Sequence, residues 1–301
     1  MSGEAHSRGV PDVARAYSCA ADHYDRQALS FWDRFGTQTV ARLGLAAGDR
    51  VLDLCCGAGA SAIPAARAVG PDGHVRAVDI SGPLLDLGRA RAHELQLQNI
   101  DFTLADATRL ALPDGSFDAV VCVFGVFFVP DMPGFVAEMW RMVRPGGTLA
   151  VTTWGVGLFE PANSLFWREV RLLRPDLDRG FNPWDDVTTV ESLGSLLAGA
   201  GVVEPRVQYD GGVHALHRPE EFWDIVMGSG YRATVEALAP DQRTVLRSRL
   251  DSELHARGVT SLTTDVVFAT ARRSSPDGGV RGGHSAPPGR PRPGLDDAAH
   301  S

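Results

Sequence analysis

The sequence predicts an α/β fold in which a doubly wound, mostly parallel sheet carries a helical cap. From residue 50 onward, short β-rich runs alternate with helical patterns, and such alternation is typical of βαβ units. Residues 119–124 form a continuous apolar run, as expected for a central strand buried on both faces. Gly57 and Gly59 stand where the first strand would turn into its helix, and open α/β sheets bind ligands at such turns.

Two amphipathic stretches, residues 13–24 and 31–45, precede the first predicted strand. We expect them to form an N-terminal helical lid within residues 1–49. The sheet follows, with strands predicted at residues 50–54, 74–79, 100–104, 117–124 and 148–153. Helices are predicted between these strands at residues 60–68, 83–96 and 132–143.

The pattern changes after residue 153, because it contains more helix than crossovers between strands require. Helices are predicted at residues 159–173, 190–200, 219–227 and 241–255, and strands at residues 203–209 and 262–271. The surplus predicts a cap made of insertions around residues 155–190 and 215–258. The domain built on the sheet would then extend from residue 50 to residue 273.

The last part of the chain has a different composition. Residues 274–301 contain six Gly, five Pro and four Ser and no aromatic residue. Such a segment buries too little apolar area to offset the entropy of ordering it. We therefore predict a disordered tail over residues 274–301.

Composition and charge exclude several classes of protein. The 301 residues include 29 Lys and Arg against 37 Asp and Glu, a net charge of −8, which argues against a protein that coats nucleic acid. The longest apolar run, residues 119–129, is about half the length of a membrane span. The first 13 residues lack the apolar stretch of a secretory signal, and four cysteines are too few for a disulfide framework. We expect a cytoplasmic protein.

The glycine turn and the acids around it point to an adenosyl ligand. Gly57 and Gly59 also satisfy the dinucleotide fingerprint, with Asp79 at the expected distance after them, so Asp79 is assigned to ribose hydroxyls for either kind of ligand. Asp53 precedes the turn, where a carboxylate suits a ligand ammonium better than a pyrophosphate. Asp106 follows the third strand, placed to reach an adenine amino group. A structural role for each acid stays open from the residues alone.

Several motifs, in the right order and spacing, resemble those of the class I S-adenosylmethionine-dependent methyltransferases. They occupy residues 51–59, 78–80, 104–107, 117–120 and 142–147. Within that superfamily the chain most resembles the quinone-biosynthesis C-methyltransferases and related small-molecule methyltransferases. The resemblance covers about residues 50–153. It implies a Rossmann-like sheet of seven strands with an antiparallel last strand, and S-adenosyl-L-methionine as the cofactor.

The resemblance also implies a set of cofactor-binding residues. The glycine turn would surround the methionine part, Asp79 would hold the ribose, and the residues after the third strand would complete the adenine site. The full set is Tyr24, Asp53, Gly57, Ala58, Gly59, Asp79, Ile80, Asp106, Ala107, Val123 and Phe124. Cys55 and Cys56 have no other Cys or His at ligand spacing, so we predict no metal site and interpret both as small buried residues.

The segment after the fourth strand bears on the acceptor. Quinone-type relatives have polar residues where this chain has Phe127 and Phe128. This difference argues against a quinone precursor and favours an apolar or planar acceptor, with packing between helix and sheet as the alternative. Aromatic residues outside the sheet also favour a largely hydrophobic cavity. The predicted substrate pocket comprises Phe31, Phe128, Trp154, His217 and Tyr231.

Methyl transfer from an activated sulfonium depends mainly on positioning and exclusion of water, so the absence of an obvious base does not weaken the prediction. We assign no catalytic residue. The candidate bases are His214, His217, Tyr24 and Glu160. His217 also suits the start of a helix, because acids follow it in the first turn.

The predicted function is therefore transfer of a methyl group from S-adenosyl-L-methionine to a small, apolar or aromatic acceptor by in-line displacement. A cyclase or binding protein that keeps the fold and cofactor without methylation stays open. An NAD-dependent oxidoreductase is a further alternative, favoured only by the glycine fingerprint. We expect a small-molecule partner and no nucleic acid, and leave a homo-oligomer open.

Overall fold

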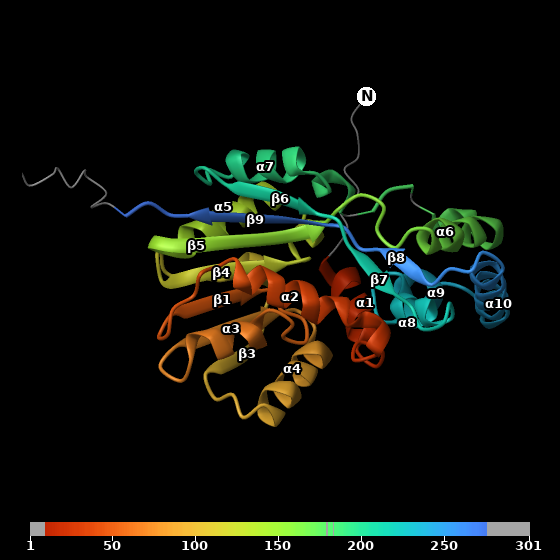
Figure 1. The fold of residues 1–301 in the computed structure, drawn as a ribbon, viewed down its shortest axis with the longest axis horizontal. Helices are drawn as coiled ribbons and strands as arrows, with labels where there is room; N and C mark the ends of the chain where they lie inside the picture. Colours follow the sequence, from red (N-terminus) through yellow and green to blue (C-terminus); the bar gives the residue numbers. More distant parts are fainter. Residues whose placement is uncertain (1–9, 179, 183, 276–301) are drawn as a thin grey trace, which may run out of the picture.

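A seven-stranded sheet forms the centre of the molecule (Figure 1). The computed structural model describes residues 10–178, 180–182 and 184–275. The sheet order is β3-β2-β1-β4-β5-β9-β6, and β9 runs antiparallel to β5 and β6 while β1 to β5 pair in parallel. The strands are β1 (Arg50–Leu54), β2 (His74–Asp79), β3 (Ile100–Leu104), β4 (Phe117–Val123), β5 (Val143–Trp154), β6 (Arg206–Asp210) and β9 (Val266–Arg272). The predicted fold class, with its antiparallel last strand, is confirmed.

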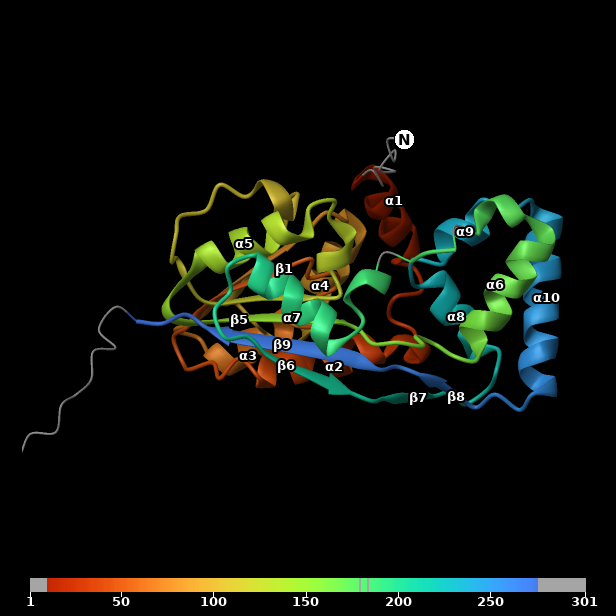
Figure 2. The same ribbon diagram turned by 90° about the horizontal axis from the view of Figure 1, so that it is seen from above.

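Helices cover both faces of this sheet. On one side lie α2 (Phe31–Ala41) and α3 (Ala62–Val69), and on the other lie α5 (Met132–Met142) and α7 (Val190–Gly199) (Figure 2). The helix α4 (Gly82–Glu94) connects β2 to β3. Central strand β4 is buried over most of its length, in agreement with its apolar sequence. Each fully buried Val there, Val120 and Val121, contributes about 1.5–3 kcal/mol by leaving water.

The remaining helices gather at one end of the molecule, beyond the sheet (Figures 1 and 2). They are α6 (Ala162–Leu173), α8 (Glu221–Met227), α9 (Arg232–Glu236) and α10 (Pro240–Ala256), and a two-stranded sheet of β7 (Val213–Ala215) and β8 (Ser261–Thr263) accompanies them. The helix α1 (Val10–Ala20) contacts both α4 and α9. The division into lid, sheet domain and cap insertions stays a prediction, and the tail lies outside the described residues from residue 276 onward.

Several element boundaries differ from the predictions for local reasons. The predicted strand 117–124 ends at Val123, because Phe124 has a φ of 56°. The predicted helix 159–173 begins at Ala162, since Phe159 has a φ of 58°. The predicted strand 262–271 is two strands, β8 and β9, because the backbone between them bonds to Gly212 and Gly155 instead of continuing either ladder.

Other predicted elements are present but begin or end at different residues. The predicted helix 13–24 is α1, which ends at Ala20, and the predicted helix 31–45 is α2, which ends at Ala41. The predicted strand 148–153 is β5, which is longer than predicted because it already pairs with β4 at Val143. The strand expected at 203–209 begins at Arg206. Neither β7 nor α9 was predicted.

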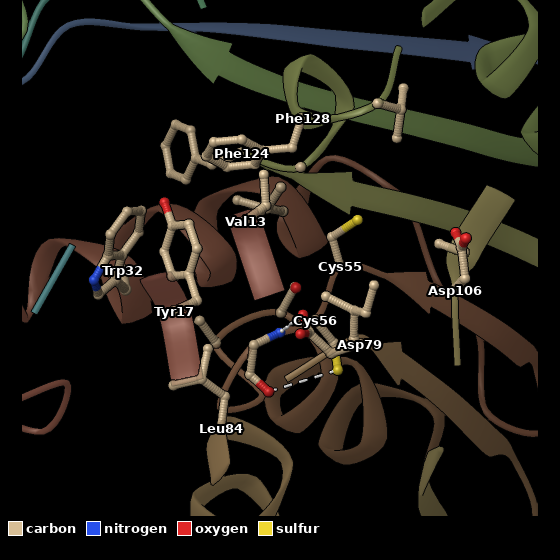
Figure 3. A pocket seen from close by; sticks show the side chains of 18 of the residues that line it. Val13, Tyr17, Trp32, Cys55, Cys56, Asp79, Leu84, Asp106, Phe124 and Phe128 are labelled. Carbon is tan, nitrogen blue, oxygen red and sulfur yellow. Dashed lines mark hydrogen bonds between the residues drawn. The ribbon is translucent and has the colours of Figure 1, made fainter. Parts of the chain in front are cut away.

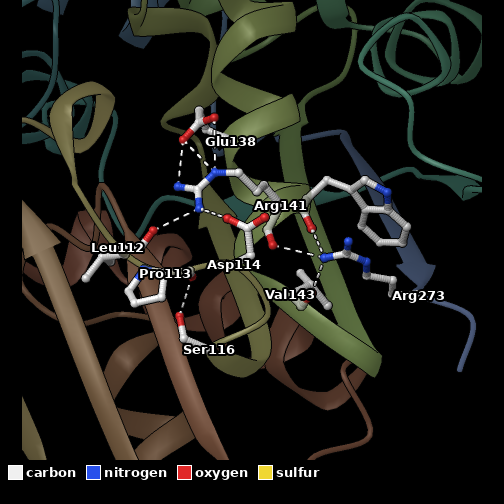
Figure 4. Close-up of polar contacts among 9 residues, drawn as sticks. Leu112, Pro113, Asp114, Ser116, Glu138, Arg141, Val143 and Arg273 are labelled. Carbon is white, nitrogen blue, oxygen red and sulfur yellow. Dashed lines mark hydrogen bonds and ion pairs between the residues drawn. The ribbon is translucent and has the colours of Figure 1, made fainter. Parts of the chain in front are cut away.

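Polar contacts close the edge of the sheet where β4 and β5 begin (Figure 4). Arg141, in the last turn of α5, donates to the carbonyl of Leu112 at 2.8 Å and to the carboxylates of Glu138 and Asp114. Arg273 donates from one nitrogen to three carbonyls, those of Trp140, Arg141 and Val143. Carbonyls at a helix C-terminus lack partners within the helix, so Arg273 satisfies those of Trp140 and Arg141. Arg141 joins the end of α5 to the segment before β4.

No helix in the described part of the chain is both long and apolar enough to cross a membrane. The four cysteines are free thiols. The described residues contain no group of three or more His, Cys, Asp or Glu side chains that could hold a metal ion.

Candidate functional site

A cavity lies at the carboxyl ends of β1, β2, β3 and β4, and we call it the first cavity (Figure 3). Asp79 and Asp106 lie on the strand side of it, and the aromatic rings of Tyr17, Trp32, Phe124 and Phe128 lie across from them. Many of the predicted site residues line this cavity: Tyr24, Gly57, Asp79, Ile80, Asp106, Ala107, Val123, Phe124 and Phe128.

Asp79 holds the glycine turn through both of its carboxylate oxygens. Oδ2 accepts the backbone N–H of Gly57 at 2.8 Å, and Oδ1 accepts the backbone N–H of Ser81 at 2.8 Å. Gly57 has a φ of 54°, a conformation that favours glycine. Burial raises the pKa of Asp79, although these N–H donors act in the opposite direction. Each carboxylate oxygen can accept a further hydrogen bond, and Asp79 lines the cavity.

Asp53 is fully buried and lies beneath the turn. Its Oδ2 accepts a hydrogen bond from the hydroxyl of Ser61 at 2.7 Å, while its Oδ1 has no partner among the described residues. Burial raises the pKa of Asp53 to about 7. Ser61 lines the first cavity whereas Asp53 does not, so Asp53 is connected to the cavity through Ser61.

Ala58 and Gly59 belong to the same turn but do not line the first cavity. Ala58 is completely buried. The backbone N–H of Gly59 donates to the carbonyl of Cys56 at 2.9 Å, and this bond closes the turn. Their places in the structure fit a role in shaping the turn, and their assignment to cofactor binding stays a prediction.

The residues after β3 form a short capped turn on the far side of Asp79. Asp106 accepts hydrogen bonds from the backbone N–H of Thr108 at 2.9 Å and from its hydroxyl at 2.7 Å. Ala107 and Thr108 line the cavity beside it. This arrangement fixes the carboxylate of Asp106 at the cavity wall, in place to accept from a ligand amino group.

At the end of β4 the chain turns sharply. Phe124 adopts a φ of 56°, a left-handed conformation that is costly for a side chain of this size, and its ring stacks on Trp154 with centroids 3.8 Å apart. Gly125 follows, and a Cβ there would lie 2.4 Å from the Cβ of Cys55. Only glycine therefore fits where the ends of β1 and β4 approach each other.

The two cysteines of the turn are not reactive groups. A hydrogen bond with Cys122 and burial raise the pKa of Cys55, and burial raises the pKa of Cys56. Both thiols are therefore protonated at neutral pH, since only a lowered pKa produces the reactive thiolate. This state agrees with the interpretation of Cys55 and Cys56 as small packing residues.

The N-terminal segment covers the first cavity with two tyrosines. Tyr24 lies over the glycine turn, because its hydroxyl is 3.1 Å from the position that a Cβ on Gly57 would take. Its ring stacks parallel to Trp32, with centroids 5.8 Å apart. Tyr17 also lines the cavity, although the sequence did not identify it as a site residue. An aromatic residue in an amphipathic helix gave no signal that it would face a ligand rather than the core.

A second cavity of 690 Å³ adjoins the first, which measures 110 Å³. Val13, Tyr17 and Phe128 line both cavities and so form the wall between them. The second cavity is lined mainly by α6, α9 and described residues between positions 176 and 184, and Tyr231 is among its lining residues. Phe128 and Tyr231 are thus the two predicted substrate-pocket residues that line it.

The other predicted pocket residues and candidate bases lie elsewhere. Phe31 and Trp154 are buried among other aromatic rings and line neither cavity, and His217 is exposed and lines neither. His214 is buried in β7, away from both cavities, and burial lowers its pKa. Glu160 accepts hydrogen bonds from Ser164 and Asn163 beside the second cavity without lining it.

Phe127 and Phe128 have different environments. Phe127 is buried and packs edge-on against Trp184 with centroids 5.9 Å apart. Phe128 lines both cavities. Phe127 therefore agrees with the packing alternative, and the place of Phe128 in an acceptor pocket stays a prediction.

Comparison with known proteins identifies what this arrangement resembles. A family model described as "Methyltransferase domain" matches residues 51–147. The demethylmenaquinone methyltransferase of Listeria welshimeri is 35% identical over 142 residues, which cover 46% of this chain and 60% of that enzyme. The chain thus spans about three fifths of the Listeria enzyme's length. The demethylmenaquinone methyltransferase of a Geobacillus species is 30% identical over 211 residues, which cover 65% of this chain and 90% of that enzyme.

Solved structures show the same fold. The YcgJ protein from Bacillus subtilis superimposes with a TM-score of 0.55 and 16% sequence identity, over 80% of this chain and 99% of that chain. At this identity the likeness concerns the fold alone.

Proposed function

Because the chain belongs to the class I S-adenosylmethionine-dependent methyltransferases and is homologous to the demethylmenaquinone methyltransferases, we propose that it transfers a methyl group to a small apolar or aromatic acceptor. The cofactor of this family is S-adenosyl-L-methionine, which supplies a methyl group already activated on a sulfonium. One observation carries the proposal. The acids Asp79 and Asp106 and Gly57 of the glycine turn all line a single cavity whose opposite wall is aromatic.

The residues of the first cavity fit the cofactor. Buried Asp53 lies behind the cavity wall and would act as a counter-charge for a ligand ammonium through the hydroxyl of Ser61, which donates to it and lines the cavity. The lone pairs of Asp79 suit a ribose diol, and Asp106 suits the amino group of an adenine. A pyrophosphate would bring negative charge close to Asp53, so the same carboxylate disfavours a dinucleotide.

The chain's own residues position the reactants and exclude water. Tyr24 and Trp32 cover the glycine turn from the N-terminal side. Val123, Phe124 and Gly125, at the end of β4, would flank the reacting centre. Their apolar surface suits a cation that loses its charge as the reaction proceeds, and bringing the reactants together contributes most of the rate enhancement expected for a one-step displacement.

No base is required from the described lining of the first cavity. Both cysteines that line it have raised pKa values, and burial also raises the pKa of Tyr17 and Tyr24. These groups hold their protons at neutral pH. These thiols and phenols therefore cannot take a proton from the acceptor.

The proposal is tested with cofactor labelled in its methyl group, incubated with extracts of aromatic and lipophilic compounds. We expect label in the organic phase with the wild-type protein. We expect much less label with Asp79→Asn at a cofactor concentration near the wild-type Kd, because its amide disturbs the ribose contact while it keeps the shape of the side chain. Failure of label transfer by a protein that binds the cofactor would contradict methyl transfer and support a non-methylating role on this fold.

A further inference from the structure

The strand β6 forms one open edge of the seven-stranded sheet, because it ends the sheet order and pairs with β9 alone among the described strands (Figure 1). We propose that this edge binds the same edge of a second copy of the chain, so that two β6 strands pair antiparallel about Gln208 and join both sheets. Open strand edges are templates for pairing with another chain. The residues of β6 line neither cavity, so this interface is independent of the proposed function.

The hydrogen bonds between β6 and β9 determine which backbone groups of β6 face outward. The N–H of Thr264 donates to the carbonyl of Gly212 at 2.8 Å, and this pair continues the register in which β6 faces β9. Bonded and non-bonded pairs alternate along an antiparallel ladder, so residues 206, 208 and 210 direct their backbone groups toward β9. The N–H and C=O groups of Val207 and Tyr209 therefore point to the open edge.

An antiparallel pair about Gln208 uses these outward groups. Val207 of each copy faces Tyr209 of the other as a bonded pair, and the two residues of such a pair exchange both of their N–H···O bonds. The two Gln208 residues meet at the twofold axis as a non-bonded pair. The contact uses the same surface on both copies, as a twofold interface requires.

The charges of β6 are complementary to themselves in this register. Arg206 of one copy faces Asp210 of the other, because both residues are equally distant from Gln208. Arg206 is exposed and has no ion-pair partner in the part of the chain that the structure describes, and Asp210 pairs with Arg42 only at 3.8 Å. Opposite charges directly across a strand pair are stabilising, and like charges are destabilising. A parallel pair would set like charges against each other, so the charges favour the antiparallel one.

Exposed apolar side chains lie at both ends of this strand. Val203 precedes β6 and is 59% exposed, and Val213 follows it and is 64% exposed. Both are equally distant from Gln208 along the chain, so the same axis brings Val203 of one copy toward Val213 of the other. Their contact would remove apolar surface of both copies from water.

Helix α7 covers one face of β6 and leaves room for a second copy. A Cβ on Gly194 of this helix would lie 3.8 Å from the side chain of Val207. The next exposed residues of the helix, Ser195 and Ala198, are small. The same helix of the second copy lies on the same face of the joined sheet, and no bulky side chain at these positions keeps it away.

The opposite edge of the sheet, β3, lacks this complementarity. An antiparallel pair about its central residue, Phe102, would set Asp101 against Thr103. No basic residue of β3 would then face Asp101 across the axis. The comparison favours β6 as the edge that binds a second copy.

Sedimentation velocity with charge-reversed variants tests the interface. An edge of five residues makes a small contact, so we expect a weak dimer that forms as the concentration rises from about 1 to about 300 µM. Arg206→Asp and Asp210→Arg should each stay monomeric, because like charges then face each other. An equimolar mixture of the two variants should dimerise, since one copy carries acids and the other carries arginines at both positions. The control Asp101→Arg, on β3, should dimerise as the wild type does.

Three results would overturn the proposal: a wild type that stays monomeric over the whole range, loss of the dimer in Asp101→Arg, or a mixture of folded variants that stays monomeric. Circular dichroism and Tm show whether each variant is folded.

A cysteine at the axis tests the register if a charge variant does not fold. Opposed residues of a non-bonded pair have Cα atoms about 4.5 Å apart, within reach of a disulfide. Glutathione disulfide should therefore link two copies of Gln208→Cys, and it should not link the control Asp101→Cys on β3. The wild type, whose four cysteines are free thiols, gives the background. Linking of Gln208→Cys no greater than that of the control would contradict the pairing about Gln208.

Discussion

Asp79 connects the first two strands of the sheet to the proposed cofactor site. It accepts backbone N–H groups from the glycine turn and from Ser81, and it also lines the first cavity. One carboxylate therefore shapes the turn and presents lone pairs to the ligand. This double role explains why a single substitution should affect binding so strongly.

Asp79→Asn should weaken binding of S-adenosylhomocysteine about ten- to a hundredfold, because hydrogen bonds to a charged group contribute about 1.5–3 kcal/mol. Titration calorimetry measures this loss. Asp101→Asn is the matched control, since Asp101 is exposed on β3, pairs with His74 and does not line the first cavity. Equal affinities of wild type and Asp79→Asn would refute the ribose role of Asp79.

Asp53 should make the stability of the free protein depend on pH. Its pKa is about 7 in the folded protein against 3.8 for the unperturbed group, so the folded state holds the proton more tightly. The stabilisation is present below about pH 4 and is lost as pH rises through about 7. At about 1.4 kcal/mol per pKa unit the effect is about 4 kcal/mol at most.

Asp53→Asn removes this titration. Urea denaturation at pH 5 and pH 8 should show a smaller loss of stability for the variant than for the wild type between these two values. The variant should also bind S-adenosylhomocysteine more weakly at pH 8, where the wild-type carboxylate would pair with the ligand ammonium. The same pH dependence in both proteins would show that Asp53 is not the titrating group.

At the scale of elements, ion pairs hold the N-terminal segment against the sheet domain. Arg91 of α4 pairs with Asp25 and, at 3.2 Å, with Asp33. Arg232 of α9 pairs with Asp22. Asp22 and Asp25 flank Tyr24, so these contacts hold the tyrosine over the glycine turn. They connect α4 on one side and the cap helices on the other to the same short segment.

Arg91→Met should loosen this segment without unfolding the protein. Partly exposed ion pairs contribute about 1 kcal/mol or less, so we expect a two- to fivefold weaker affinity for S-adenosylhomocysteine and little change in Tm. Hydrogen exchange should become faster at residues 21–30. The control is Arg89→Met. Arg89 lies on the same helix, and among the acidic side chains of the described residues it pairs only with exposed Asp86. Unchanged exchange in Arg91→Met would show that the pairs do not hold the segment.

The sequence could predict the long elements because their hydrophobic periods extend over many residues. β1 and β3 match the predicted bounds, and so does β2. β7 and α9 have three and five residues, too few to establish a period. Phe124 and Phe159 adopt left-handed backbone conformations, so β4 ends earlier and α6 begins later than predicted. The intrinsic propensities of phenylalanine indicate neither change.

The candidate site was predictable in part, because the predicted strands place some of its residues. Asp79 and Asp106 follow strands, so the topology alone brings them to one edge of the sheet. Phe31 and Trp154 were assigned to a pocket by their aromatic character, which does not distinguish a cavity wall from the core. Tyr17 was missed because its position depends on how α1 packs against α4 and α9, a tertiary contact that the sequence of the helix does not contain.

At the scale of the whole molecule, the two cavities meet where three parts of the chain come together. The strand ends supply the polar side of the first cavity, the cap helices supply much of the second, and α1 separates them with Tyr17. This geometry suits two reactants that must approach from different sides. The central claim is that the first cavity binds S-adenosyl-L-methionine rather than a dinucleotide.

Thermal unfolding with S-adenosylhomocysteine or NAD tests that claim most directly. At a ligand concentration of about 100 times Kd, binding to the folded state alone adds about 2.7 kcal/mol, which corresponds to about 5–10 °C in Tm for a chain of this size. S-adenosylhomocysteine should give this rise, and NAD should leave Tm unchanged. A rise with NAD and none with S-adenosylhomocysteine would contradict the account.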